Sequence, residues 1–201
     1  YDRKILIINT KRVNSIHIIN KGSQIIGFSG STLFGLEKKL EKFNREPHSV
    51  IGSSCIGASI VGGVCNNSGG ALVKRGPAYT ELSLYAQIEP GGKLSLVNDL
   101  GIDLGDTPEE ILTNLENKNY TKSQIQFPDK NASDKEYRKR IRQVNANTPA
   151  RFNGDERRLY AASGCAGKIG VFAVRLDTYQ KPKRSAVFYV GSNNSFVFGQ
   201  I

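Results

Sequence analysis

The sequence predicts an α+β fold built from short strands and few helices. Its apolar fraction of 38% and charged fraction of 23% are typical of a globular protein. Short apolar runs of the length and residue type found in strands alternate with turn residues along the chain. Helix signals are confined to three segments. A chain of 201 residues is long enough to bury a sizeable core, in one domain or in parts of two.

The apolar pattern and the turn residues locate each expected element. Strands are expected at 5–8, 15–19, 24–28, 80–89, 93–97, 169–176 and 187–190. Helices are expected at 32–43, from 107 onward and at 134–144, with a polar loop over 117–134. The first helix has its leucines three or four residues apart on one face. The second begins with a capping box, because Thr107 caps, Pro108 suits the first turn and Glu110 closes the box.

Charge and composition limit the classes of partner. The net charge of +10 is compatible with a polyanion such as nucleic acid or an anionic membrane surface, and equally with a solvated basic face. The cations are not interleaved with aromatic residues and no nucleic-acid motif is present, so no nucleic-acid partner is expected. The absence of methionine and the apolar runs at both ends lead us to expect a piece of a longer protein.

Cysteines and histidines give little support for a metal or disulfide framework. Cys55, Cys65 and Cys165 form no CxxC pair, and we expect reduced, buried thiols that act as small hydrophobes. His17 and His48 are the two histidines, which leaves a metal site without its usual ligands. No metal is therefore expected.

The segment from 47 to 70, PHSVIGSSCIGASIVGGVCNNSGG, carries the chemistry. It holds six glycines among serines and asparagines, and no charged side chain occurs from 49 to 73. Glycine allows another molecule to approach the backbone closely, and outward N–H groups suit phosphates, ribityl hydroxyls and the polar edge of a flavin. The pattern matches neither the Walker A nor the GxGxxG motif, and it is too interrupted for an ordinary helix or strand. Tight packing of turns and strands is the alternative role for these glycines.

Several motifs together resemble a known family. The order of a strand, GSTLFGLEKKLEKF and a Pro-led glycine segment ending in Asn-x-Gly-Gly resembles the FAD-binding domain of the vanillyl-alcohol oxidase type, known as PCMH-type. With RGPAYTE, LGIDLG, NTPARFN and SGCAGKIGVFAVRLDT added, the chain resembles the quinone-dependent, membrane-associated D-lactate dehydrogenases of bacteria. The motifs occur in the family's order and span nearly the whole chain.

The resemblance implies a set of flavin contacts. They fall on Gly52, Ser59, Gly69 and Val171, and we add Ser53, Gly63 and Asn67 because they share the local segment. Ordinary core packing is the alternative for Val171. Lys74, Arg75 and Tyr79 follow the glycine segment and could approach cofactor or substrate, although solvated surface is the expected role of the two cations. No catalytic base is assigned.

The resemblance also implies an activity and a location. The expected reaction is FAD-dependent oxidation of D-lactate to pyruvate, with electrons passed to quinone. The family docks peripherally on the cytoplasmic face of the bacterial inner membrane, and the basic charge agrees with an anionic surface. The alternatives are another FAD-linked 2-hydroxyacid oxidoreductase or related flavoprotein of the same fold, and a non-enzymatic basic module that binds nucleic acid.

The family's domain order predicts how the chain is divided. Residues 1–177 would form a PCMH-type FAD-binding domain with a mixed sheet and flanking helices, lacking its N-terminal subdomain. Residues 178–201 would begin a substrate or cap domain. The pyrophosphate loop is expected before Tyr1 and the lactate-binding residues after Ile201, so this piece would hold an incomplete active site.

Overall fold

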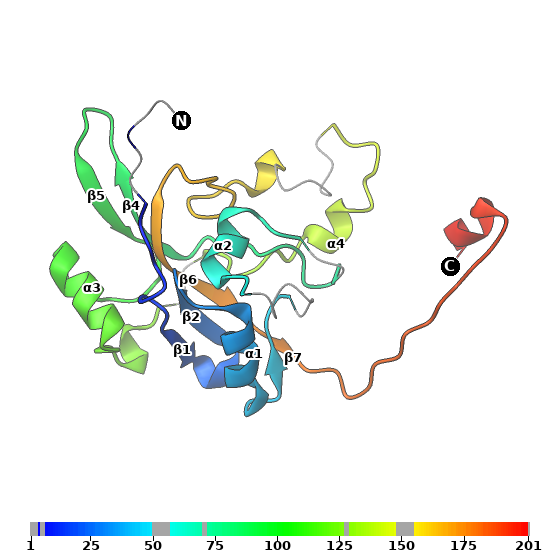
Figure 1. The fold of residues 1–201 in the computed structure, drawn as a ribbon, viewed down its shortest axis with the longest axis horizontal. Coiled ribbons are helices and arrows are strands. Elements are labelled where there is room, and N and C mark those ends of the chain that lie inside the picture. Colours follow the sequence, from blue (N-terminus) through cyan, green and yellow to red (C-terminus); the bar gives the residue numbers. More distant parts are fainter. Residues whose placement is uncertain are drawn as a thin grey trace.

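A five-stranded antiparallel sheet forms the centre of the chain, and the predicted α+β class is confirmed (Figure 1). The computed structural model describes residue 4 and residues 7–49, 57–69, 72–126, 129–147 and 155–200. The strand order is β1-β2-β6-β4-β5, and a second sheet pairs β3 with β7. The strands are β1 (Ile16–Ile19), β2 (Gln24–Phe28), β3 (Arg45–Glu46), β4 (Ser83–Ile88), β5 (Leu94–Asn98), β6 (Gly170–Asp177) and β7 (Tyr179–Gln180).

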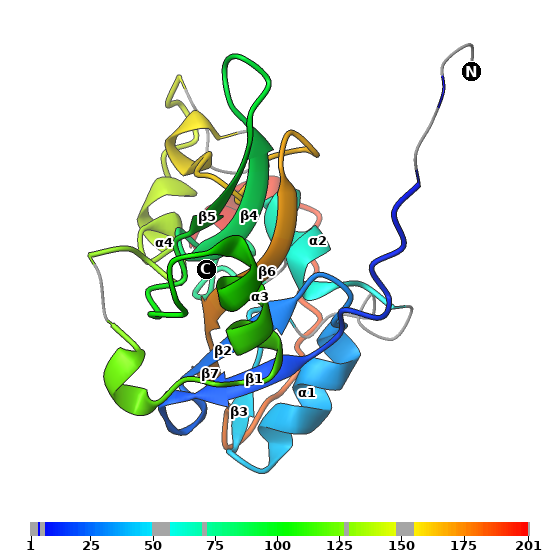
Figure 2. The ribbon, with the colours of Figure 1, turned by 90° about the vertical axis from the view of Figure 1, so that its left-hand side faces the viewer.

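The helices are short and lie on both faces of the sheet (Figure 2). The α-helices are α1 (Leu33–Glu41), α2 (Ile60–Cys65), α3 (Pro108–Glu116) and α4 (Tyr137–Arg140). The 3-10 helices are η1 (Asn20–Gly22), η3 (Lys122–Gln124), η4 (Glu156–Arg158) and η5 (Ser195–Gln200). The predicted helix at 134–144 is therefore confined to the four residues of α4.

Two apolar clusters divide the core between the faces. Ile25 of β2 and Val174 of β6 pack with α1 and α2, whereas the neighbouring Ile26 and Ala173 pack with α3. Successive side chains of a strand point to opposite faces, so adjacent apolar residues feed different clusters. The central strands are consequently apolar on both faces, and their sequences show continuous rather than alternating apolar runs.

The strands of the described sheets run antiparallel, whereas we predicted a mixed sheet. The pairs β1–β2 and β4–β5 are antiparallel neighbours, and β6 enters between them antiparallel to both β2 and β4. Every pairing within the described sheets is antiparallel. The reason lies in the connections, because two short turns build hairpins and the late strand β6 then joins their inner edges.

Local capping chemistry agrees with the sequence prediction. Thr32 caps α1 by accepting a hydrogen bond from the Gly35 N–H at 3.1 Å. Thr107 and Glu110 form the complete capping box at the start of α3, with Pro108 in the first turn. These caps satisfy backbone donors that have no partner inside a helix.

Two predicted strands are wrong in the described residues. Ile7 and Ile8 are exposed and have no strand structure, and the remaining residues of that prediction, 5 and 6, lie outside the described part. Residues 187–190 are also exposed and extended without pairing, in the C-terminal segment that leaves the body of the fold (Figure 1). A strand needs neighbours for its backbone groups, and none of the described strands reaches either segment.

Candidate functional site

The glycine segment builds a short helix, which our sequence analysis did not predict. Ser59 caps α2, its hydroxyl oxygen accepting a hydrogen bond from the Gly62 N–H at 3.0 Å. Ile60, Val61 and Val64 are buried in the cluster shared with α1 and β6, and this burial stabilises a helix that glycine otherwise disfavours. The prediction that the segment is neither helix nor strand is therefore wrong for 60–65, because tertiary packing outweighs local propensity.

A pocket of about 300 Å³ lies against the exposed face of this helix. We call it the glycine pocket. Its lining residues are Leu33, His48, Ser49, Ala58, Ser59, Gly62, Gly63, Ser68 and Gly69. None of these residues carries an acidic, lysine or arginine side chain, so the pocket suits an uncharged, partly apolar group better than a bare phosphate.

The glycines of the pocket serve two different purposes. A Cβ on Gly62 would lie 2.5 Å from the Ser59 Oγ, so a side chain here would displace the capping hydroxyl. A Cβ on Gly69 would meet no atom within 4 Å, and one on Gly63 would meet only ordinary contacts at 3.5 Å and beyond. Protein packing does not require glycine at Gly63 or Gly69, and the missing side chains leave the backbone accessible there.

Backbone donors are used differently from what we expected. The N–H of Gly62 donates to the Ser59 Oγ, and the N–H of Gly63 donates to the Ser59 carbonyl at 3.1 Å. The expectation that these amides point outward as donors is wrong for both residues, because the helix forms. The bare surface of the glycines, rather than these two N–H groups, is what the pocket offers to a ligand.

Three of the seven predicted site residues meet at the glycine pocket. Ser59, Gly63 and Gly69 line it, whereas Asn67 and Val171 do not. The other two predicted residues, Gly52 and Ser53, lie outside the described residues, as does Cys55.

Asn67 and Val171 contribute to the framework behind the pocket. Asn67 is buried with a φ of 44°, and its Nδ2 donates to the Arg158 carbonyl at 2.8 Å. Val171 pairs with Tyr85 in the central sheet and packs against the cluster that contains α2. Their predicted flavin contacts remain predictions.

His48 is the pocket residue that sequence analysis did not select. It is 7% exposed, and its Nδ1 is buried without a hydrogen-bond partner. Burial, and secondarily the charge of Arg75, lowers its pKa to about 4. The imidazole is therefore neutral at pH 7. Its position at the start of the glycine segment is the sequence signal that could have identified it.

The residues after the glycine segment have structural partners. The Arg75 guanidinium donates to the Glu46 carboxylate at 2.5 Å and to the Pro47 carbonyl at 2.7 Å, so the expectation of solvated surface is wrong for it. Lys74 is exposed, as expected. The Tyr79 hydroxyl is buried and donates to Glu81 at 2.7 Å, and burial raises its pKa.

The two described cysteines are free thiols, in agreement with the sequence prediction. Cys165 is buried and Cys65 is partly buried against the core. Burial and the neighbouring Cys165 thiol raise the pKa of Cys65 to about 12, so it is protonated and unreactive at neutral pH. In the part of the chain that the structure describes, no three His, Cys, Asp or Glu side chains gather as a metal ion would require.

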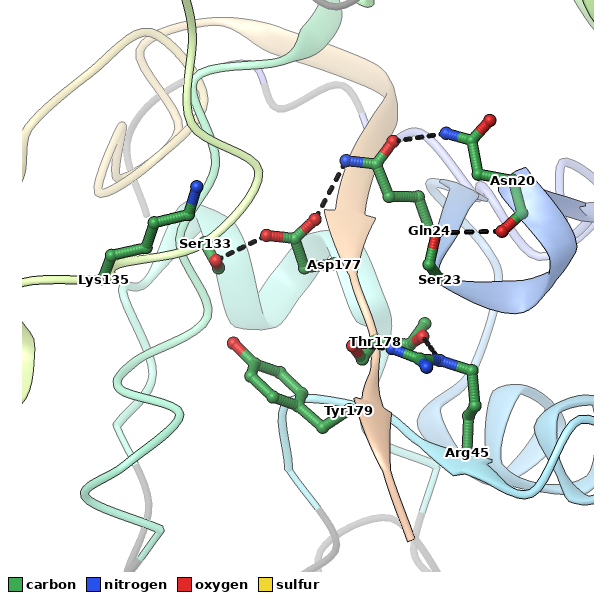
Figure 3. A pocket seen from close by; sticks show the side chains of 9 residues that line it. All are labelled: Asn20, Ser23, Gln24, Arg45, Ser133, Lys135, Asp177, Thr178 and Tyr179. Carbon is green, nitrogen blue, oxygen red and sulfur yellow. Dashed lines mark hydrogen bonds between the residues drawn. The ribbon is translucent and has the colours of Figure 1, made fainter.

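A second, larger pocket of about 590 Å³ contains none of the predicted site residues. It lies where β6 ends and β2 and β7 begin, and Figure 3 shows most of its polar side chains bonded to one another. Asp177 accepts from Gln24 at 2.9 Å and from Ser133 at 2.6 Å, while Arg45 donates to Thr178. Because these groups satisfy one another, we take the glycine pocket as the candidate site.

Comparison with known proteins supports the family resemblance. Over all 201 residues the chain is 59% identical to a quinone-dependent D-lactate dehydrogenase of Haemophilus influenzae, 54% to one of Escherichia coli and 42% to one of Corynebacterium glutamicum. The resemblance to quinone-dependent D-lactate dehydrogenases is confirmed. The chain spans only about a third of these dehydrogenases, 36%, 35% and 35% of their lengths. No protein-family model matches the chain.

The histidine pKa predicts how stability depends on pH. His48 has a pKa of about 4 in the folded chain and 6.5 when unfolded, so between these values the unfolded state binds more protons. The neutral His48 imidazole makes its full contribution to the free energy of unfolding above pH 6.5. That free energy falls by up to about 3 kcal/mol as the pH drops towards 4. Urea unfolding from pH 7 to 4.5 should show a smaller loss in His48→Gln than in wild type. An equal loss of unfolding free energy in both proteins would contradict the lowered pKa of His48.

Proposed function

We propose that this chain is the FAD-binding part of a quinone-dependent D-lactate dehydrogenase. The observation that carries the proposal is an uncharged pocket lined in part by Gly63 and Gly69, two glycines that the packing of the protein does not require. It lies in the segment on which the family's flavin contacts fall. The similarity to the three dehydrogenases supports the same assignment, although their names do not mention FAD.

The residues of the glycine pocket fit a flavin. Gly63 and Gly69 leave the backbone open to a flat ring, and a Cβ on Gly69 would project into free space that a ligand can fill. Leu33 and Ala58 add apolar contact, and the hydroxyls of Ser49, Ser59 and Ser68 add hydrogen-bonding groups without bulk. We retain as proposals the flavin contacts that the family resemblance implies for Gly52, Ser53, Asn67 and Val171, of which Asn67 and Val171 lie behind the pocket.

The proposed fold is a PCMH-type FAD-binding domain. Its sheet, with α1 and α2 on one face and α3 on the other, holds the pocket wall in place through the buried residues of α2. We propose that residues 1–177 belong to this domain and that 178–201 begin a substrate or cap domain. The exposed apolar side chains of Phe188, Tyr189 and Phe196 support that division, because such residues are usually covered in an intact protein.

The proposed reaction is oxidation of D-lactate to pyruvate, with quinone as the final electron acceptor. FAD, when bound, supplies the hydride acceptor for this chemistry. The pocket residues of this chain bind and orient the cofactor. His48 is a poor candidate for the base that accepts the lactate hydroxyl proton, because a pKa of about 4 lies far below neutral pH.

We also propose that the protein docks peripherally on the cytoplasmic face of the bacterial inner membrane. The net charge of +10 and the exposed Lys181, Lys183 and Arg184 support attraction to anionic lipid. Within the described residues, no helix combines the length and the apolar character that a membrane span requires.

Replacing Gly69 with valine tests the pocket. The branched side chain would occupy the open space, and because overpacking costs about 1–3 kcal/mol, FAD affinity of the full-length protein should fall about tenfold or more. Stability of the apoprotein should change by less than about 0.5 kcal/mol, since no protein atom is displaced. Gly191→Val is the matched control, because Gly191 also has open space around it but lies outside the pocket. Equal FAD affinity in Gly69→Val and wild type would refute this site.

The substrate is tested by the visible spectrum of the full-length protein. The purified protein should be yellow, and anaerobic addition of D-lactate should bleach the flavin absorbance because the cofactor becomes reduced. L-lactate should leave the spectrum unchanged, and added quinone should restore the absorbance after D-lactate. A flavin spectrum that D-lactate does not alter would contradict the proposed substrate while leaving FAD binding intact.

A further inference from the structure

A buried histidine beside the glycine pocket lacks a hydrogen-bond partner. The side chain of His48 lines the pocket next to Gly63, and its Nε2 lies 3.8 Å from the position that a Cβ on Gly63 would take. Its Nδ1 is buried and no protein group bonds to it. A buried polar group without a partner destabilises the fold and calls for an explanation.

The second histidine of the chain shows what a satisfied imidazole looks like. His17 is equally buried at 7% exposure, but its Nδ1 forms a 2.8 Å hydrogen bond with the Tyr120 hydroxyl. Its ring also packs edge-on against Phe28, with ring centroids 5.1 Å apart. Burial alone therefore does not explain the unpaired Nδ1 of His48. What distinguishes His48 is its position in the wall of a pocket.

The neighbours of His48 hold its backbone in place and keep its ring neutral. Arg75 donates to the carbonyl of Pro47 at 2.7 Å and forms an ion pair with Glu46, so the chain that leads into His48 is fixed. Burial and the Arg75 charge lower the pKa of His48 to about 4. At pH 7 the ring offers one donor and one acceptor but no charge.

We propose that His48 is a cofactor-contacting residue whose Nδ1 forms its missing hydrogen bond with the riboflavin half of bound FAD. The proposal rests on the function proposed above. A neutral imidazole in a pocket without lysine, arginine or acidic side chains matches the ring edge or a ribityl hydroxyl, both of which are uncharged. A phosphate is instead recognised by cations and charge-assisted hydrogen bonds.

Three substitutions of His48 test the proposal in the full-length apoprotein. Leucine removes both ring nitrogens, asparagine keeps a polar group near the Nδ1 position, and glutamine keeps one near the Nε2 position. Titration with FAD should show about tenfold weaker binding for His48→Leu and His48→Gln, because one hydrogen bond to a buried group is lost. His48→Asn should bind FAD within about threefold of wild type, a difference of about 0.7 kcal/mol.

Fragments of the cofactor identify the half that is contacted. FMN should lose affinity for His48→Leu by the same factor as FAD, whereas ADP should bind the variant and wild type equally. His17→Leu is the control for a buried histidine outside the pocket. It should lower the thermal stability of the apoprotein, since the bond to Tyr120 is lost, without changing FAD affinity.

The outcomes separate this inference from the proposed function. If wild type binds FAD and His48→Leu binds it equally well, the role of His48 is refuted and the proposed function stands. Weakened ADP binding, or loss of affinity in His48→Asn but not in His48→Gln, would also overturn the assignment. If His48→Leu does not fold, the asparagine and glutamine variants carry the test. A wild-type protein that binds no FAD would refute both proposals.

Discussion

The structure depends on one constraint, which is that α2 must bury one face while its other face stays bare. Ile60, Val61 and Val64 anchor the helix to the cluster beneath the sheet, and the glycines between them face the pocket. Glycine weakens a helix by about 1 kcal/mol per residue relative to alanine, but it keeps the backbone of α2 accessible at the pocket. The Ser59 cap compensates in part, and its bridge to Thr32 places the starts of α1 and α2 side by side.

The charged residues of this region are paired with one another and do not line the pocket. Arg75 pairs with Glu46, and the buried Asp134 pairs with Arg140 and with Arg158, whose carbonyl accepts a hydrogen bond from Asn67. Such pairs fix loops that contain little regular structure, and their charges are compensated locally. The lining itself consequently offers hydroxyls, one neutral imidazole and bare backbone. This combination suits a neutral ring system and explains why the overall positive charge does not identify the ligand.

Features that depend on neighbours along the chain could be predicted from the sequence. The capping box at Thr107 and the hairpin at 83–98 were predictable because local chemistry determines them. The α2 helix was not, because its stability comes from burial against distant β2 and β6. Arg175 also escaped prediction: it is 1% exposed in the central strand, where it donates to the carbonyls of Leu100 and Gln126. A run such as 187–190 has strand composition but no partner among the described strands.

An experimental structure of the full-length protein with FAD bound tests the central claim most directly. We expect the riboflavin half of the cofactor to lie in van der Waals contact with the Gly69 backbone, within about 4 Å. We also expect the Ser59 and His48 side chains to face the cofactor. A structure with other protein side chains packed into the glycine pocket, and the cofactor bound elsewhere, would contradict the account.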